Sequence, residues 1–527
     1  MRTTLLLLLA LPLVAGHKKP QHEHHLRIQV QSRDMRFPEG VDDHTCEFSW
    51  DTMTCVPDAY CSYQYKFGDL TFDQSCRLVP ESVGRVPQHL HLAYAGEDAG
   101  TGMSVSWTTY AEVDDPAVWI GTSKDALELV DADIEVATYY ESDDYHLYNY
   151  HVIAQDLKPA TQYFYRVGSQ SESAHQSEVF HFTTARSADE TKPFSVAFYG
   201  DFGVDANADA TMQYVNDNLP VLVDFVFHIG DISYADNAFT KATEFFGFFY
   251  EETYNRWMAT LSRVMTSVPY MVLVGNHEAE CHSPACAISS SKKDQLGNYT
   301  AFNTRFRMPS EESGGVENMW YSFEHGPVHY TAISSETDFP SPPSNSYVGR
   351  TYGGFGNQLA WLEADLKKAH ENRKNVPWLI VGMHRSMYTR DHADDIGEPI
   401  DHAATLQAAF EDLFIKYEVD VVVSGHVHWY ERQFPIKKNE AVMDGVSEDG
   451  NTYTNPKAPV YLVTGAAGNT EGHEASPRNE IEWNAVLDNE NYGISILNVT
   501  RKTLSWSFIA TETGEVLDEF SIVKDEA

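Results

Sequence analysis

The chain has 527 residues, and its 77 acidic and 37 basic side chains give a formal net charge of −40. Nucleic acids and anionic membranes are repelled by such a charge, so neither is an expected partner. A chain of this length is expected to form about three domains. Any anionic ligand has to be held by local positive charge.

The first residues have the features of a secretory signal peptide. Arg2 precedes an apolar stretch over residues 5–15, and the small residue Gly16 follows it. That stretch is too short to anchor a protein in a bilayer, and no other stretch has the length of a membrane span. We therefore expect residues 1–16 to be removed and the protein to be secreted, or delivered to an acidic compartment of the secretory pathway such as a vacuole.

Residues 17–84 combine a histidine-containing tail with a cysteine-rich extension whose role stays open. The chain has six cysteines, an even number that predicts complete pairing in an oxidising compartment. Cys281 and Cys286 are expected to pair across a short loop. The remaining cysteines allow more than one pairing: Cys46, Cys55, Cys61 and Cys76. Zinc binding by these four is disfavoured because no Cys-x-x-Cys pair is present. The triplets beginning at Asn298 and Asn498 fit the secretory route and could carry N-linked glycans.

Residues 85–187 have the pattern of an all-β module. Tyr163, Tyr165 and Val167 alternate with other residues, which is the periodicity of a half-buried strand. The expected strands, each bounded by turn residues, cover 89–93, 103–107, 150–154, 162–167 and 179–183. The stretch 157–167 resembles the late strands of fibronectin type III domains, so a β-sandwich is expected.

From residue 188 onward, apolar runs alternate with amphipathic helices. Residues 356–372 and 405–417 are expected helices, since in each the leucines and phenylalanines repeat on one face. Such helices pack against a sheet, and their apolar residues belong to the core. We therefore expect an α/β domain over residues 188–527.

Five short polar motifs in this region each follow a β-branched or aromatic apolar run. The runs cover 195–199, 222–229, 270–274, 378–381 and 419–423, and their composition is typical of strands buried on both faces. The motifs are Asp201-Phe202-Gly203, Gly230-Asp231-Ile232-Ser233-Tyr234, Gly275-Asn276-His277-Glu278, Val381-Gly382-Met383-His384 and Gly425-His426-Val427-His428. If the runs are strands of one sheet, the polar side chains meet at one rim, where α/β proteins bind ligands.

These side chains form a donor set suited to two metal ions. Carboxylate, phenolate and amide oxygens together with imidazole nitrogens favour iron, manganese or zinc, and no thiolate is offered. Asp231 can bridge two cations at roughly the 3.5 to 4 Å separation that suits in-line phosphoryl displacement. A single motif of this kind is more often an ordinary turn. All five in order, each at the end of an apolar run, favour the metal site.

With these motifs, residues from about 85 to 510 resemble the purple acid phosphatases of the metallophosphoesterase superfamily. The resemblance implies an α/β catalytic domain, a metallophosphoesterase-type β-sandwich flanked by helices, preceded by an all-β fibronectin type III-like domain. The ligands that it implies are Asp201, Tyr234 and His428 for Fe(III), Asp231 as the bridge, and Asn276, His384 and His426 for a divalent Zn, Mn or Fe. Tyr234 is the residue that separates this family from other metallophosphoesterases.

Two further histidines are expected beside the metals. His277 directly follows Asn276, so the two side chains diverge, and the resemblance implies that His277 hydrogen-bonds the substrate phosphate. Family members often carry a histidine pair soon after the residue that matches His384. Between residues 385 and 395 this chain has only His392, about one residue short of that spacing. His392 is the expected acid for the leaving group, and the alternative is a solvated loop histidine.

The resemblance implies a secreted acid phosphatase that hydrolyses phosphate monoesters. Hydroxide on the metals would attack phosphorus in line, even in acid, because ferric iron strongly lowers the pKa of bound water. The same centre could instead act on phytate, diphosphates or phosphodiesters, since the motifs do not define the pocket walls. The expected wall residues are Arg385, Tyr388, Asp338, Glu431 and Arg432. A secreted adhesion or partner-binding protein with a vestigial metal site is the other class, disfavoured because every expected ligand is present.

Overall fold

The structure of the chain is a computed structural model. It describes residues 84–141, 145–237, 249–344, 346–347, 349–475 and 480–525, and the backbone of β1 (Phe48–Ser49), β2 (Thr54–Cys55), β3 (Cys61–Phe67) and β4 (Leu70–Cys76). The expected signal peptide, the histidine-containing tail and the side chains of the first four cysteines lie outside the described residues, so those expectations stay predictions. Within the described ranges, no helix is long and apolar enough to cross a membrane.

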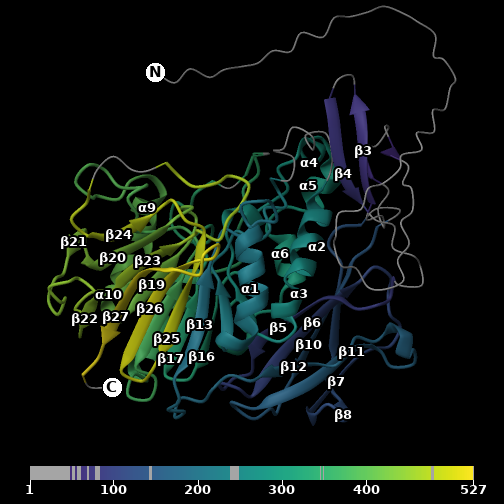
Figure 1. The fold of residues 1–527 in the computed structure, drawn as a ribbon, viewed down its shortest axis with the longest axis horizontal. Helices are drawn as coiled ribbons and strands as arrows, with labels where there is room; N and C mark the ends of the chain where they lie inside the picture. Colours follow the sequence, from purple (N-terminus) through teal and green to yellow (C-terminus); the bar gives the residue numbers. More distant parts are fainter. Residues whose placement is uncertain are drawn as a thin grey trace, which may run out of the picture.

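The first part of the described chain is an all-β sandwich of two antiparallel sheets (Figure 1). The sheets have the orders β5-β6-β10-β9 and β12-β11-β7-β8. Their strands are β5 (Gln88–Ala95), β6 (Gly102–Thr109), β7 (Pro116–Ser123), β8 (Ala126–Leu129), β9 (Ile134–Ala137), β10 (Tyr148–Ala154), β11 (Gln162–Ser169) and β12 (Phe180–Thr183), with a short 3-10 helix η2 (Ser173–His175) before β12. The expected strands are all present. The sequence did not predict β7, β8 and β9. β7 is partly buried, whereas β8 and β9 are largely exposed and lack an apolar face.

The second part is an α/β domain built on two mixed sheets, which together with the sandwich confirms the expected fold class. One sheet has the order β15-β14-β13-β25-β26-β27-β22, and the other β16-β17-β18-β19-β23-β20-β21 with β24 paired to β20. The first sheet contains β13 (Phe194–Tyr199), β14 (Phe225–His228), β15 (Tyr270–Val272), β22 (Thr452–Thr454), β25 (Gly493–Val499), β26 (Thr503–Ala510) and β27 (Val516–Val523). The second contains β16 (Tyr321–His325), β17 (Val328–Ala332), β18 (Trp378–Gly382), β19 (Val421–Ser424), β20 (Tyr430–Lys437), β21 (Glu440–Ala441), β23 (Val460–Thr464) and β24 (Asn484–Asp488). The exact domain boundaries stay predictions.

The condition that the five apolar runs are strands of one sheet is not met. β13, β14 and β15 are parallel neighbours in the first sheet, whereas β18 and β19 are parallel neighbours in the second. An apolar run shows that a strand is buried, but it does not show which of two packed sheets the strand joins. The sheets lie close together, since a Cβ on Gly382 of β18 would approach the Phe227 ring of β14 to 3.0 Å.

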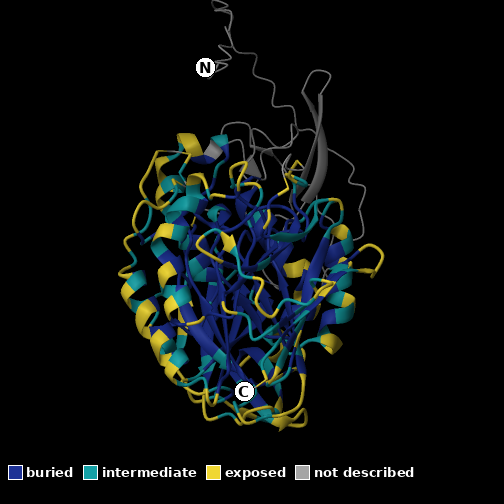
Figure 2. Cartoon of the chain, turned by 90° about the vertical axis from the view of Figure 1, so that its left-hand side faces the viewer, coloured by how far each residue is buried: buried dark blue, intermediate teal, exposed yellow. Residues whose placement is uncertain are grey.

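Helices flank the sheets, and those on the outside of the α/β domain have buried faces turned inward and exposed faces turned to solvent (Figure 2). They are α1 (Asp209–Leu222), α2 (Tyr250–Thr260), α3 (Ser262–Met265), η4 (Asn276–Glu278), α4 (Pro284–Ile288), α5 (Ser290–Gln295), α6 (Thr300–Arg305), α7 (Ser310–Ser313), α8 (Gln358–Glu371), α9 (Asp401–Leu406), the π-helical turn η5 (Gln407–Glu411) and α10 (Asp412–Lys416). The expected helix over 356–372 is α8. The expected helix over 405–417 begins earlier, at Asp401, and bulges at η5 before it continues as α10.

A buried polar network joins the sandwich to the α/β domain. Arg305 of α6 donates to the Tyr139 hydroxyl at 2.7 Å and to Glu251 of α2 at 3.0 Å. The Tyr145 hydroxyl donates to the same carboxylate at 2.9 Å. Arg305 and Glu251 are buried, so their charges are paired away from water. This network fixes the two parts of the chain against each other.

Candidate metal centre

The polar motifs lie in loops that bend sharply where their strands end. Asp201, Asp231, Tyr234 and His426 have φ angles of +61°, +53°, +53° and +69°, in the left-handed region that is unfavourable for a residue with a side chain. The loops also approach one another closely, since a Cβ on Gly425 would lie 2.4 Å from Asp201 Oδ2. Four of the predicted ligands thus have an unfavourable backbone conformation.

Asp201, Tyr234 and His428 form one group of donors. Tyr234 Oη lies 3.3 Å from Asp201 Oδ1 and 3.0 Å from His428 Nε2, and that nitrogen lies 3.5 Å from Asp201 Oδ1. All three side chains are buried. Burial, and then the Asp201 carboxylate, raise the pKa of Tyr234 well above its ordinary 10.0. A phenolate at this position therefore requires a strong Lewis acid, such as Fe(III).

Asp231, Asn276, His384 and His426 form the other group. His384 Nε2 lies 2.9 Å from Asp231 Oδ2 and 3.2 Å from Asn276 Oδ1. Donor atoms of Asp231, His384 and His426 all lie within 4.8 Å of one another. Burial lowers the pKa of His384, but the Asp231 carboxylate outweighs burial and raises it to about 9. A cation bound by this group must replace the His384 proton.

Backbone carbonyls orient two of the histidines. Nδ1 of His384 donates to the carbonyl of Ile229 at 2.9 Å, and Nδ1 of His428 donates to the carbonyl of Gly472 at 2.9 Å. A histidine that donates from Nδ1 can offer the lone pair of Nε2 to a metal, which is the usual arrangement of an imidazole ligand. With the carboxylate, phenolate and amide oxygens, these donors fit a pair of hard or borderline cations.

Glu278 is a buried carboxylate whose place in the centre the sequence did not reveal. It accepts hydrogen bonds from the backbone N–H groups of Asp231, Ile232 and Gly275, at 3.0, 2.7 and 2.7 Å. Burial, and then Asp231, raise its pKa to about 8. Its position in the Gly-Asn-His-Glu motif was the one sequence feature that pointed to a role in the centre. Only the fold shows that Glu278 holds the loop of Asp231.

His277 lies beside the centre, as expected from its divergence from Asn276. Its Nδ1 donates to Asp236 Oδ2 at 2.7 Å, and its backbone N–H donates to Asp231 Oδ1 at 2.9 Å. Its Nε2 lies 3.8 Å from Asp231 Oδ2 and 3.8 Å from Glu471 Oε2. The imidazole is therefore held by the carboxylate of Asp236 and turned toward that of Asp231.

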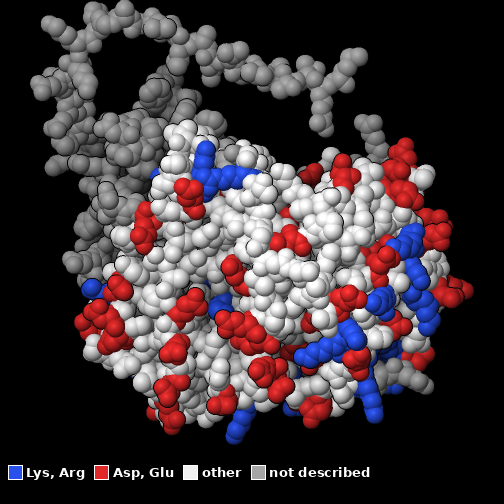
Figure 3. Space-filling model, turned by 180° about the vertical axis from the view of Figure 1, so that it is seen from behind, with Lys and Arg blue, Asp and Glu red and all other residues white. Residues whose placement is uncertain are grey.

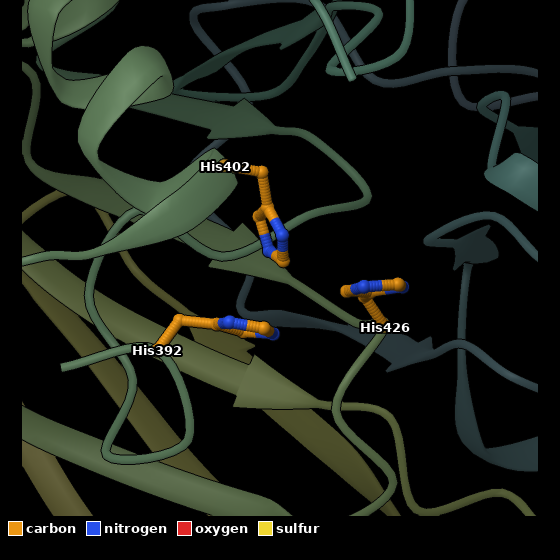
Figure 4. A group of neighbouring side chains, drawn as sticks. All are labelled: His392, His402 and His426. Carbon is orange, nitrogen blue, oxygen red and sulfur yellow. The ribbon is translucent and has the colours of Figure 1, made fainter. Parts of the chain in front are cut away.

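His392 and a histidine that the sequence analysis missed, His402, lie together on the His426 side of the centre. Figure 4 shows the three rings facing a common space, and their donor atoms lie within 4.8 Å of one another. The ring centroids of His392 and His402 are 3.9 Å apart. His402 lies in the first turn of α9, so it is beyond the short segment in which a histidine pair was expected. Only one histidine lies between residues 385 and 395, and this was the sequence feature that pointed to a partner further along the chain.

The expected pocket walls require a correction. Four of the residues are buried: Arg385, Tyr388, Glu431 and Arg432. Of these, Arg385 contacts His426, a predicted ligand, at 2.8 Å. Glu431 instead supports the loop that carries His392, because it accepts hydrogen bonds from the Thr389 hydroxyl at 2.8 Å and the Arg390 backbone at 3.1 Å. Proximity to a motif along the chain does not show whether a side chain turns toward a pocket or into the core.

The sequence matches three families in consecutive segments. Residues 87–184 match the family described as "Purple acid Phosphatase, N-terminal domain", residues 194–430 match "Calcineurin-like phosphoesterase", and residues 458–519 match "Iron/zinc purple acid phosphatase-like protein C". These segments correspond to the sandwich, to the part of the α/β domain that holds all five motifs, and to its C-terminal strands.

Similar proteins cover most of the chain. An acid phosphatase of Aspergillus ficuum is 30% identical over 475 residues, which cover 71% of this chain and 76% of that protein. Acid phosphatase type 7 of Mus musculus is 31% identical over 473 residues, which cover 85% of this chain and 95% of that protein. The structure of purple acid phosphatase PPD1 from yellow lupin seeds matches with a TM-score of 0.66 over 88% of this chain and 79% of that chain, at 21% identity. That structural match supports the fold.

Proposed function

Since the chain belongs to the purple acid phosphatase family of the metallophosphoesterase superfamily, we propose that it is an acid phosphatase that hydrolyses phosphate monoesters at a centre of Fe(III) and one divalent cation. The observation that carries the proposal is the meeting of the two donor groups. The backbone N–H of His426, from the second group, donates to Asp201 Oδ2 of the first group at 2.9 Å. Relatives that span most of the chain are named acid phosphatases.

The proposed ligands are Asp201, Tyr234 and His428 for Fe(III), Asn276, His384 and His426 for Zn, Mn or Fe in the divalent state, and Asp231 for both cations. When bound, the two cations supply a nucleophile derived from water and neutralise charge on the phosphate. The high pKa of Tyr234 and the carbonyl-oriented histidines support this assignment.

His277 is the proposed donor to a phosphate oxygen. Burial lowers its pKa, but the carboxylates of Asp236 and Asp231 outweigh burial and raise the pKa well above the ordinary 6.5. The imidazole therefore keeps an N–H on Nε2 while Nδ1 is held by Asp236. A fixed donor beside the reacting phosphate stabilises the charge that builds up as the ester bond breaks.

His392 is the proposed acid for the leaving group, with His402 as its positioning partner. An oxygen from water bonds to phosphorus while the bond from phosphorus to the ester oxygen breaks, and the departing oxygen takes up a proton. Burial lowers the pKa of His392 below the ordinary 6.5, so its protonated form gives up a proton readily. The contact between the His392 and His402 rings limits how His392 can turn.

Secretion is part of the proposal. Cys281 and Cys286 are paired in the structure, and a structural disulfide is typical of an oxidising compartment. Acidic side chains are spread over the face shown in Figure 3, so an anionic substrate has to be captured by local charge at the centre. The described residues favour a working centre over a vestigial one, because none of the expected ligands is displaced from it.

The test is a purified, secreted protein whose visible spectrum, metal content and aryl phosphate hydrolysis at acid pH are measured together. We expect a violet protein with iron and one divalent metal, and activity that is lost in Asp231→Asn. The matched control is Asp217→Asn, because Asp217 lies on the surface and pairs with Arg263 at 2.8 Å. A folded, colourless protein without bound metal or activity would overturn the assignment.

A further inference from the structure

The three histidines proposed to bind metal differ in the group that faces one of their ring nitrogens. His384 and His428 each donate from Nδ1 to a backbone carbonyl at 2.9 Å. Nε2 of His426 instead faces Nη1 of Arg385, at 2.8 Å. Two of these imidazoles therefore meet an acceptor, and the third meets a permanently charged donor.

An arginine in this place is in conflict with a neutral imidazole ligand. A metal-bound neutral histidine uses one nitrogen as its lone-pair donor and keeps an N–H on the other, which normally donates to a carbonyl or a carboxylate. If the cation takes Nε2 of His426, it must replace Arg385. If the cation takes Nδ1, the remaining N–H on Nε2 faces the N–H of a guanidinium. In both cases the observed contact has to open.

Arg385 is held in this place by its surroundings. Its Nε donates to Glu336 Oε2 at 2.9 Å, and its backbone N–H donates to Ser335 Oγ at 2.8 Å. Arg385 and Glu336 are both buried. The guanidinium is therefore a buried charge held in a fixed position. A surface side chain, in contrast, could move into water at little cost in free energy.

We propose that Arg385 competes with the divalent cation for His426 and thereby speeds the loss of that cation from the centre. The inference rests on the proposed binuclear centre. The iron position lacks this competition at its histidine, since His428 donates to the Gly472 carbonyl. Loss of the divalent cation is then expected to be faster with Arg385 in place than without it.

The test measures metal loss from the fully loaded protein during dialysis against a chelator, with iron and zinc followed by mass spectrometry. In Arg385→Gln the charge is gone and the amide oxygen can accept from His426, so zinc loss should be about 10- to 100-fold slower than in the natural protein, the usual size of effects from groups that orient metal ligands. The matched control is Arg390→Gln, because the Arg390 side chain contacts Asn484 at 3.5 Å. Its zinc loss should stay within about twofold of the natural protein.

Equal zinc loss from Arg385→Gln and the natural protein, with iron retained in both, would overturn the inference and leave the proposed function intact. Absence of iron from the natural protein would instead count against the proposed function. If Arg385→Gln does not fold, crystal structures of the natural protein with iron alone and with both metals decide the matter. We expect the Arg385 to His426 contact only in the first, and its persistence at full zinc occupancy would refute the competition.

Discussion

Asp236 Oδ2 accepts a hydrogen bond from Nδ1 of His277 at 2.7 Å, and this bond sets the direction of the imidazole that is turned toward Asp231. The same oxygen lies 2.8 Å from Nδ1 of His282. Asp236 is buried, so this carboxylate has little access to water and depends on its two histidine partners. The orientation of His277 therefore rests on a residue outside the proposed ligand set.

Asp236→Asn should lower kcat by on the order of 10- to 100-fold while metal content and the violet colour stay unchanged, because the amide cannot hold a charged His277 as the carboxylate does. The pKa of His277 should fall, since a main group that raises it is lost. The acidic-to-neutral limb of the pH-rate profile should then move to lower pH. The comparison variant is His282→Gln, which keeps the Asp236 carboxylate that holds His277. An unchanged pH profile in Asp236→Asn would refute this role.

The grouping of the proposed metal ligands could be predicted from the sequence, because each of these residues follows an apolar run that brings it to the end of a strand. Asp201, Asn276 and His384 are examples, and the structure places each beside other expected ligands. The division of the runs between two sheets could not be predicted, since strands of both sheets are equally buried. That division depends on packing between distant segments.

Residues that support the ligands were harder to predict. Asp236 and Glu278 lie within or next to motifs, but a carboxylate in a sequence gives no sign of whether it is buried. His402 lies in α9 and reaches His392 because the chain between them folds back, with Ile400 donating its backbone N–H to the His392 carbonyl at 2.9 Å. Contacts that form where the chain folds back depend on the conformation of the loop. The hydrophobic periodicity of the sequence does not describe that conformation.

His392→Gln and His402→Gln should affect slow leaving groups more than fast ones. A nitrophenolate departs without much help from an acid, whereas an alkoxide needs a proton, so the loss of kcat should be about 10- to 100-fold for an alkyl phosphate and much smaller for nitrophenyl phosphate. The double variant should be little worse than His392→Gln alone, because residues that act as a unit do not contribute additively.

The control for this pair is His370→Gln in α8, whose ring contacts the carbonyl of Tyr417 at 3.2 Å. Its rates with both substrates should match those of the natural protein. If His392→Gln slowed both substrates equally, the proton donor would have to be sought elsewhere, with His277 as the next candidate.

The two sequons should differ in glycan occupancy. Asn498 is exposed on β25, whereas Oδ1 of Asn298 accepts a hydrogen bond from the Gly353 backbone at 2.8 Å and Tyr299 beside it is buried. The Oδ1 atom of Asn498 also accepts a hydrogen bond, from the Ser195 hydroxyl at 2.7 Å, but that contact is exposed. Because Asn298 is half-buried, a glycan on its Nδ2 would have less room than one on Asn498. We expect glycopeptide mass spectrometry to find Asn498 occupied and Asn298 largely bare. Loss of the glycan mass in Asn298→Gln, but not in Asn498→Gln, would contradict this.

The Arg305 and Glu251 pair should be a strong determinant of stability. Glu251→Gln leaves the buried Arg305 charge unpaired and removes an acceptor of Tyr139 and Tyr145, which should lower the free energy of unfolding by about 3 to 5 kcal/mol. The control is Glu311→Gln, because Glu311 is highly exposed and pairs with Arg307 on the surface at 3.3 Å. Glu311→Gln should lower the free energy of unfolding by less than about 1 kcal/mol, as measured by thermal or denaturant unfolding. Equal effects would show that the network contributes little.

Glu431 should make the protein more stable in acid than at neutral pH. Burial raises the pKa of Glu431 from its ordinary 4.5 to about 7, although hydrogen bonds from Thr389 and Arg390 oppose this. Between these values the folded protein keeps a proton that the unfolded chain releases, so this group contributes stability that declines as pH rises from 4.5 toward 7. The full difference between the two pKa values corresponds to a loss of about 3 kcal/mol in the free energy of unfolding.

Glu431→Gln removes this titration, while any loss from its changed hydrogen bonds is the same at every pH. The midpoint of thermal unfolding of the natural protein, relative to that of Glu431→Gln, should therefore fall as pH rises from 4.5 to 7. Glu311→Gln, on the surface, should show no such trend. Parallel curves for the natural protein and Glu431→Gln would mean that Glu431 stays ionised in the core. In that case the support of the His392 loop through Thr389 and Arg390 would be independent of pH across the range in which an acid phosphatase works.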